Sequence, residues 1–176
     1  MTERFTGTGG LALPPVTRML LRADGSTTLL LEAILDEPLS LDLVDQRTAG
    51  ADELSSGVRS VLGCAPGDKV IRRRSILRTA DGIAVSHNDV TVVSRDQELT
   101  GILTHGRIPI GHGLAAAGRR LGRTVLATGW TIWPLTESNG ARCVYKEYIL
   151  LDQESTVVAH IRERFNPMHV PDRIRG

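Results

Sequence analysis

The stretch KVIRRRSILRTADGIAVSHNDVTVV, residues 69–93, decides the fold. It predicts two β-strands, 69–79 and 82–93, joined at Ala80-Asp81-Gly82. Asp-Gly is a residue pair that tight hairpin turns prefer, because such turns need backbone conformations with positive φ. The stretch therefore predicts two neighbouring antiparallel strands.

The rest of the chain predicts more strands, with helices between some of them. The further predicted strands are 26–34, 39–47, 123–133, 142–152 and 155–165. The predicted helices are 16–25, 51–63, 95–106 and 112–122, with a loop at 107–111. This order predicts one α+β domain, residues 16–170, with a mainly antiparallel sheet of six or seven strands and helices on one flank. Residues 1–15 are rich in Gly and Pro and are predicted to be a flexible N-terminal segment.

Composition excludes several classes of protein. The chain has 176 residues and a net charge of +1, from 21 basic and 20 acidic residues, which argues against a nucleic-acid partner. No apolar run is long enough to predict a membrane span or a secretion signal. Cys64 and Cys143 lack metal-ligand spacing, so a reduced, cytoplasmic protein is the simplest interpretation, with a single disulfide left open. The oligomeric state is not predicted.

No motif for a metal or a cofactor is present. The five histidines do not occur at paired spacing within one predicted element. The glycine-rich GTGG at residues 7–10 does not follow a strand, so it does not predict a dinucleotide site. No G-x-S-x-G occurs, so a serine nucleophile at an elbow is not predicted either. The expectation is a protein that needs no metal and no cofactor.

Four arginines occur within seven residues of the predicted hairpin. They are Arg72, Arg73, Arg74 and Arg78. Such a cluster suits a small anionic ligand, and the alternative is a solvated strand edge. Arg72, Arg74 and Arg78 share one face of the strand with Ile76, whereas Arg73 shares the other with Ile71, Ser75 and Leu77. Neither face is purely apolar, so the alternation does not select the arginine that would face a ligand.

A carboxylate interrupts the apolar face of the last predicted strand, VVAHIRERF at residues 157–165. Val157, Ala159, Ile161, Glu163 and Phe165 share this face. Burial raises the pKa of a carboxyl group unless a cation or a donor is near, and a raised pKa suits proton transfer. The alternative is that Glu163 reaches water near the strand end, before Asn166-Pro167.

Four segments together resemble the chorismate lyase (chorismate pyruvate-lyase) family and its wider superfamily. They are MLLRADGSTTLLLE (19–32), RRRSILRTADG (72–82), RIPIGHGL (107–114) and HIRERFNP (160–167). They follow the order of the family's segments and span most of residues 19–167. The resemblance implies a six-stranded antiparallel sheet with loops over an internal ligand cavity, in agreement with the predicted layout.

The resemblance also implies a reaction and a site. It implies loss of pyruvate from chorismate to give 4-hydroxybenzoate, a carbon–oxygen lyase activity. Arg74 would hold the ring carboxylate and Glu163 would assist proton transfer, so both are predicted to be catalytic. The other residues predicted to contact the substrate are Ser26, Thr27, Arg107, Ile108, Ile110 and Gly111.

Two other interpretations stay open. The effector-binding domains of GntR-type transcription regulators share the superfamily fold, and residues 67–93 resemble their central hairpin about as well. The residues before Met19 are too few for the winged-helix domain that normally precedes them, so a stand-alone sensor of small molecules is the form expected here. The third possibility is a relative of the lyase that acts on another small aromatic or carboxylic acid in a biosynthetic pathway. The presence of both Arg74 and Glu163 favours the lyase.

Overall fold

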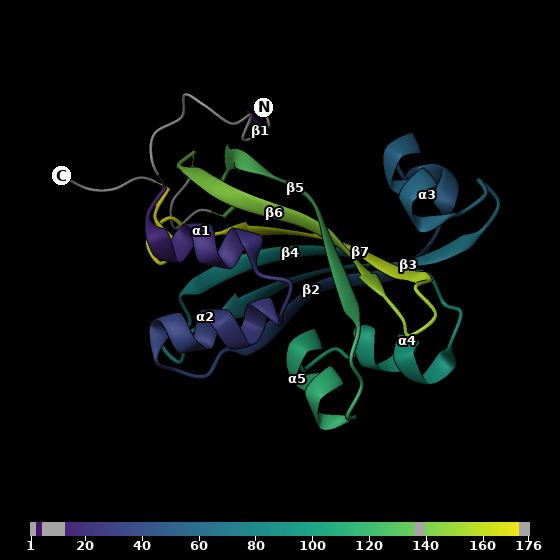
Figure 1. Cartoon of the computed structure of the whole chain (residues 1–176), viewed down its shortest axis with the longest axis horizontal. Coiled ribbons are helices and arrows are strands. Elements are labelled where there is room, and N and C mark those ends of the chain that lie inside the picture. Colours follow the sequence, from purple (N-terminus) through teal and green to yellow (C-terminus); the bar gives the residue numbers. More distant parts are fainter. Residues whose placement is uncertain (1–2, 5–12, 136–139, 173–176) are drawn as a thin grey trace.

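A computed structural model describes residues 3–4, 13–135 and 140–172 of the chain. An antiparallel sheet with strand order β1-β5-β6-β7-β4-β3-β2 forms its centre (Figure 1). The strands are β1 (Glu3–Arg4), β2 (Ser40–Gly50), β3 (Lys69–Arg78), β4 (Ala84–Val92), β5 (Gly122–Ile132), β6 (Arg142–Leu151) and β7 (Val157–Phe165). The predicted α+β domain with an antiparallel sheet is confirmed, with six long strands and the two-residue β1.

The predicted hairpin joins β3 to β4. The turn is closed by hydrogen bonds between Thr79 and Ile83, and Gly82 adopts a φ of 79°, where a side chain would strain the backbone. The register shifts by one residue after Leu77. The strand pairing predicted from the Asp-Gly signal is therefore present.

Four of the five α-helices in the described part of the chain lie on one side of the sheet, and α3 lies apart from them (Figure 1). The helices are α1 (Pro15–Arg22), α2 (Thr27–Leu35), α3 (Ser56–Leu62), α4 (Gln97–Leu103) and α5 (Ile110–Ala116), and a short 3-10 helix, η1 (Ala51–Glu53), follows β2. In the described segments no helix is long and apolar enough to cross a membrane.

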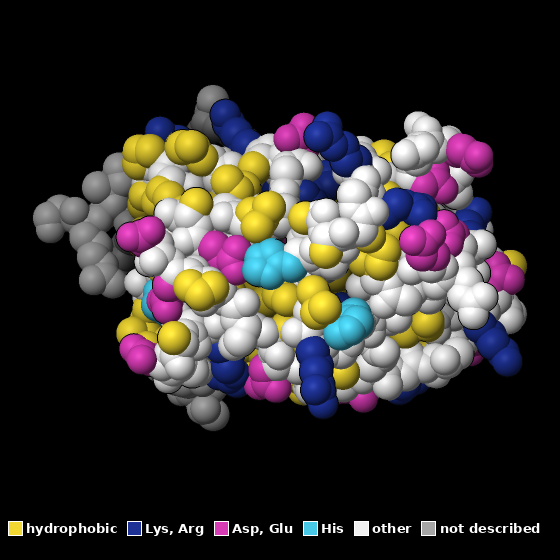
Figure 2. Space-filling view, turned by 90° about the horizontal axis from the view of Figure 1, so that it is seen from below, with side chains coloured by type: hydrophobic (Ala, Val, Ile, Leu, Met, Phe, Trp, Pro, Cys, Tyr) yellow, Lys and Arg dark blue, Asp and Glu magenta, His cyan; other side chains and the backbone are white. Residues whose placement is uncertain are grey.

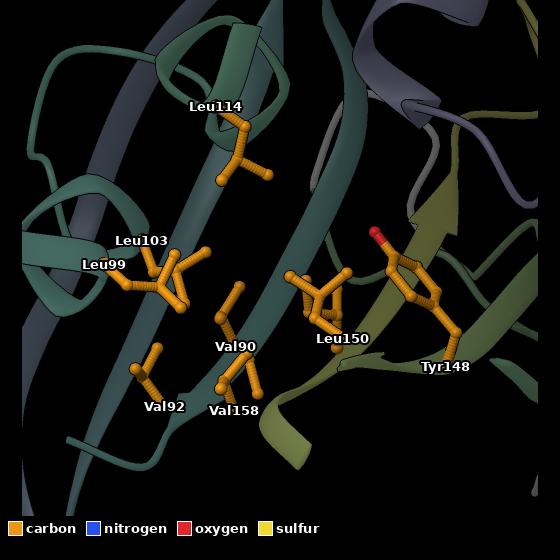
Figure 3. Packing of buried hydrophobic residues seen from close by; sticks show 10 residues of the cluster. Val90, Val92, Leu99, Leu103, Leu114, Tyr148, Leu150 and Val158 are labelled. Carbon is orange, nitrogen blue, oxygen red and sulfur yellow. The ribbon is translucent and has the colours of Figure 1, made fainter. Parts of the chain in front are cut away.

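Two apolar clusters hold these helices on the sheet. Leu99 and Leu103 of α4 and Leu114 of α5 pack on Val90 and Leu150, with Tyr148 at the edge of the cluster (Figure 3). A second cluster places leucines of α1 and α2 on the other end of the same face; its buried members are Leu20, Leu21, Leu31, Leu39, Leu77, Val85, Val144, Phe165 and Val170. Burial of a Leu side chain stabilises a fold by about 1.5–3 kcal/mol, so these contacts account for the docking of both helix pairs.

The segment predicted to be a strand at 26–34 is a helix, so that prediction is wrong. The Oγ atom of Ser26 accepts a hydrogen bond from the Leu29 amide, which caps the N-terminus of α2, and Asp36 ends the helix in the left-handed conformation. The two threonines suggested a strand, but Ser-Thr-Thr here begins a helix whose buried face is Thr27, Thr28 and Leu31.

The predicted N-terminal segment, residues 1–15, lies mostly outside the described residues. Of it, Glu3–Arg4 pair with Gly129 and Trp130 of β5, and α1 begins at Pro15.

Candidate functional site

A row of polar side chains crosses the helix-covered face of the sheet. Ser75 pairs with Asn88, Asn88 with Glu163, and Glu163 with Lys146, so four neighbouring strands each contribute one residue. All four side chains are buried; Glu163 is 6% exposed and Lys146 0%. Buried polar groups are costly unless they are partnered, so a whole row of them indicates a site rather than core packing.

The row lies between the two apolar clusters described above. Val90, Ile161 and Tyr148 border it on the side of α4 and α5, whereas Leu77 and Phe165 belong to the cluster under α1 and α2. The apolar walls lower the local dielectric, which strengthens electrostatic interactions along the row.

A cavity of about 30 Å³ opens on this row. The side chains and backbone that line it beside the row come mainly from α2, the start of α5 and two arginines: Thr27, Thr28, Pro109, Ile110, Gly111, Arg73 and Arg123. One water needs roughly 10–15 Å³ by this measure, and ligand pockets usually reach about 300 Å³ or more. The cavity therefore holds about two waters as it stands, and a larger ligand requires one of its walls to move.

The wall formed by α5 is fastened to α2. A Cβ atom at Gly111 would lie 2.0 Å from Ser26 Oγ and 3.4 Å from Thr28 Cβ, so only glycine allows this approach. The Nε2 atom of His112 lies 2.9 Å from Glu32 Oε2, a second link between the helices. Figure 2 shows this face of the molecule, where an acidic side chain touches a histidine among hydrophobic side chains.

Arg73 connects the sheet to the end of α4. Its Nη1 atom donates to the carbonyl of Leu103 at 2.7 Å and its Nη2 atom to the carbonyl of His105 at 2.8 Å. The residue is 1% exposed, and burial lowers the pKa of its guanidinium to about 10. Arg73 thus holds the segment before α5 in place and brings a positive charge to the cavity wall.

Glu163 and Lys146 face one another across β6 and β7. Burial raises the pKa of Glu163, and the nearby Thr27, Lys146 and Arg123 oppose that rise. Burial likewise lowers the pKa of Lys146, whose Nζ atom donates to the carbonyls of Leu20 and Ala23 at the end of α1. Lys146 therefore links the carboxyl group in the cavity to the C-terminus of a helix.

Several buried polar atoms around the cavity lack a hydrogen-bond partner within the described parts of the chain. They are Thr27 Oγ1, Asn88 Oδ1, Glu163 Oε2, Arg73 Nε and Arg123 Nε. The hydroxyls of Thr27 and Tyr148 lie near enough to the Glu163 carboxyl group to lower its pKa, but not in the geometry of a hydrogen bond to Oε2. Native proteins leave few such atoms buried and unpartnered. The concentration of such atoms at one cavity is typical of a binding site for a polar ligand.

The structure brings together four of the residues predicted for the site. Glu163, Thr27, Ile110 and Gly111 line the cavity. Ser26 contacts Gly111 from behind this lining. The remaining predicted contact residues of the loop, Arg107 and Ile108, are exposed and do not line the cavity, because the loop turns outward before Pro109.

Arg74 lies on the opposite face of the sheet. Its side chain is 54% exposed and its Nη2 atom lies 3.6 Å from Asp45 Oδ2. Successive side chains of a strand point to opposite faces, so the arginine on the cavity side is Arg73. The structure therefore does not bring Arg74 together with Glu163.

Sequence reasoning missed most of the polar residues of the cavity and of the row beneath it, namely Arg73, Ser75, Asn88, Arg123, Lys146 and Thr28. One signal could have identified Arg73. Three of the four clustered arginines share one face of β3, as the solvated face of a strand would, and Arg73 alone accompanies Ser75 and Leu77. The row itself depends on the register of four strands, which the sequence does not contain.

No family model matches the chain, and no curated protein matches it. PhnF from Mycobacterium smegmatis has a similar solved structure, with a TM-score of 0.62 and 16% identity over 88% of this chain and 70% of that one. Its separate effector domain has a TM-score of 0.63 and 15% identity, over 86% and 95% of the two chains. A GntR-family transcriptional regulator from Enterococcus faecalis has a TM-score of 0.53 and 16% identity, over 77% and 99%.

These similarities show that this chain has the fold of the PhnF effector domain. They contradict the expected lyase activity, because the similar structures belong to an effector domain and to transcriptional regulators. The prediction of an enzyme is therefore wrong. Its main argument, the pair Arg74 and Glu163, also fails in the structure, since the two residues lie on opposite faces of the sheet.

Proposed function

We propose that this chain is an effector-binding domain that holds a small organic anion, a carboxylate or a phosphate ester, in the cavity on the polar row. One observation carries the proposal: buried polar groups without partners gather at a cavity whose wall includes buried positive charge. The similarity to effector domains supports a binding role without chemical conversion.

The charges around the cavity favour an anion. Arg73, Arg123 and Lys146 bring three cationic groups to the cavity or its polar row, and Glu163 brings one carboxyl group. Arg73 is bonded only to neutral carbonyls among the described residues, so its charge is not neutralised by a carboxylate. A buried charge without a counter-ion is costly, and a bound anion would offset that cost.

The first turn of α2 adds to the preference for an anion. Thr27 and Thr28 lie at the N-terminus of this nine-residue helix and line the cavity. The first amides of a helix lack intrahelical acceptors and carry a partial positive charge. An acidic group between these amides and Arg123 would find donors on both sides.

Entry of the ligand requires α5 to move away from α2. The space of about 30 Å³ is too small for an organic anion, and α4 is held to the sheet by Arg73. By contrast, α5 is a seven-residue helix that is linked to α2 by the His112–Glu32 bond and by the contact of Gly111. We therefore propose that α5 is the wall that opens.

A binding experiment tests the proposed function. The purified chain would be titrated by calorimetry with a panel of small carboxylates and phosphate esters, and NMR would check that each bound compound is recovered unchanged. Arg123→Met is expected to weaken binding at least tenfold. The matched control is Arg74→Met, which removes an arginine from the opposite face and should leave affinity within about twofold.

Three results would contradict the proposal or a part of it. The first is the absence of any saturable binding across the panel. The second is an equal loss of affinity in Arg123→Met and Arg74→Met, which would show that general surface charge and not the cavity attracts the anions. Conversion of a bound compound into a product would contradict the non-catalytic part.

A further inference from the structure

Two of the unpartnered atoms at the cavity are hydrogen-bond acceptors on neighbouring strands. Asn88 Oδ1 lies on β4 and Glu163 Oε2 on β7, and the two residues are direct partners in the register. Both residues are more than nine-tenths buried and both line the cavity. An acceptor that is buried without a donor destabilises the protein, so this pair favours a guest that brings donors.

Lys146 does not donate a hydrogen bond to either acceptor, although it is the next residue of the row. Its ammonium group donates to the carbonyls of Leu20 and Ala23, which directs it toward the end of α1. Arg73 is directed elsewhere as well, toward the carbonyls of Leu103 and His105. Lys146 and Arg73 are thus committed to backbone carbonyls, and neither donates to the two acceptors.

We infer that the ligand of this cavity is an anion that also presents an amino or hydroxyl group to Asn88 and Glu163. This inference rests on the proposed function and adds the second half of the ligand to it. The acidic group would face Arg123 and the first turn of α2, and the donor group would face the sheet. Asn88 is then a specificity-determining residue, because its oxygen is satisfied only by a guest with a donor.

Apolar walls make the requirement for a donor strict. Val90, Ile161 and Leu77 flank the row and offer the guest no alternative polar contact. A site built around buried polar groups rejects an analogue that lacks the matching group, because those groups then stay unpaired. The ring or chain between the two ends of the ligand would contact these apolar side chains.

Matched pairs of compounds test the inference. The probes are 4-hydroxybenzoate and 4-aminobenzoate against 4-methylbenzoate, and glycerol 3-phosphate against propyl phosphate, each titrated by calorimetry. Within each pair the charge is the same and the size is similar, and only the donor differs. The donor-bearing member of at least one series is expected to bind the wild-type chain ten times or more tightly than its partner. The hydroxyl and amino probes separate the two kinds of donor.

Variants of Asn88 and Glu163 test whether the preference for the donor-bearing compound comes from the polar row. In Asn88→Leu and in Glu163→Leu, which remove the acceptors, the preference is expected to fall to within about threefold, whereas Arg74→Met should keep it. Equal affinity of both members of the pairs in the wild-type chain would overturn the inference while leaving anion binding intact. So would a preference that survives both variants of the row. Binding of no probe at all would overturn the proposed function together with the inference.

Discussion

Arg73 and Arg74 are neighbours in the chain, yet they lie on opposite faces of the sheet and make different contacts. Arg73 is buried and donates to the carbonyls of Leu103 and His105, at the segment that leads to α5. Arg74 is exposed and lies 3.6 Å from a carboxylate oxygen of Asp45. One step along a strand thus separates a residue that holds the cavity wall from a residue of the solvated surface.

Replacement of each arginine by Met should therefore affect stability unequally. Arg73→Met removes two hydrogen bonds from a charged donor and leaves two carbonyls without their donor, so we expect the free energy of unfolding to fall by about 3–5 kcal/mol. Arg74→Met breaks only an exposed ion pair, which is worth about 0–1 kcal/mol. Urea denaturation of both variants measures the difference. A similar decrease in the free energy of unfolding in the two variants would show that Arg73 does not anchor the C-terminal end of α4.

The contact of Gly111 with Ser26 predicts a specific non-additivity. A methyl group at position 111 would displace Ser26 Oγ and so break the cap that this atom forms at the Leu29 amide. Loss of an N-cap costs about 1 kcal/mol. We expect Gly111→Ala and Ser26→Ala each to destabilise the chain by at least this amount.

In the double variant Ser26 Oγ is absent, so the methyl group at position 111 displaces no cap. The double variant should therefore lose about 1 kcal/mol less stability than the sum of the losses in the two single variants. Thermal unfolding of all four proteins completes the cycle. Simple additivity would mean that the cap and the glycine contact are independent, contrary to the geometry.

The fold could be predicted from the sequence to the extent that it depends on local signals. Asp81-Gly82 predicted the β3–β4 hairpin, and the parity of VVAHIRERF placed Glu163 on the inner face. Local signals also misled: Thr27 and Thr28 favour strands by propensity, but after Ser26 they form the first turn of a capped helix. The tertiary contacts of Leu31 decide in favour of the helix.

The site was less predictable, because it depends on pairing between distant strands. Ser75, Asn88, Lys146 and Glu163 are spread over about 90 residues, and only their register aligns them. The choice between Arg73 and Arg74 depended on the side from which the helices cover β3. Alternation within β3 gave only a weak signal, because both faces carry arginine: three of the four lie on one face and Arg73 on the other.

The raised pKa of Glu163 predicts how stability depends on pH. Burial raises this pKa in the folded state above its value in the unfolded chain, so the protonated form favours folding. That contribution is present at low pH and is lost as the pH rises toward and through the folded-state pKa. Gln at this position cannot ionise and should not show the loss.

The stability of Glu163→Gln relative to the wild type should therefore increase with pH. The increase is about 1.4 kcal/mol per pH unit between the unfolded and the folded pKa, and the difference is constant above the latter. Urea denaturation between pH 4 and pH 9 measures it. Lys146→Met should extend the sloping range to higher pH, because Lys146 opposes the rise of the Glu163 pKa. If the difference in the free energy of unfolding between Glu163→Gln and the wild type did not change with pH, the raised pKa of Glu163 would be contradicted.

A reversible covalent link tests whether α5 must open for a ligand to enter. A Cβ atom at position 111 would lie 3.4 Å from Thr28 Cβ, close to the 3.5–4.5 Å that disulfides require, so Thr28→Cys with Gly111→Cys is suited to oxidation once Ser26→Ala removes the clash at Ser26 Oγ. In the oxidised triple variant α5 cannot leave α2, and the probes that bind the wild-type chain should bind it at least 100-fold more weakly than they bind its reduced form. Reduction of the same protein is the matched control, because it restores movement without changing the sequence. If the oxidised and reduced forms bound a probe equally well, the ligand would have to enter past another wall, and the opening of α5 would be excluded as the route into the cavity.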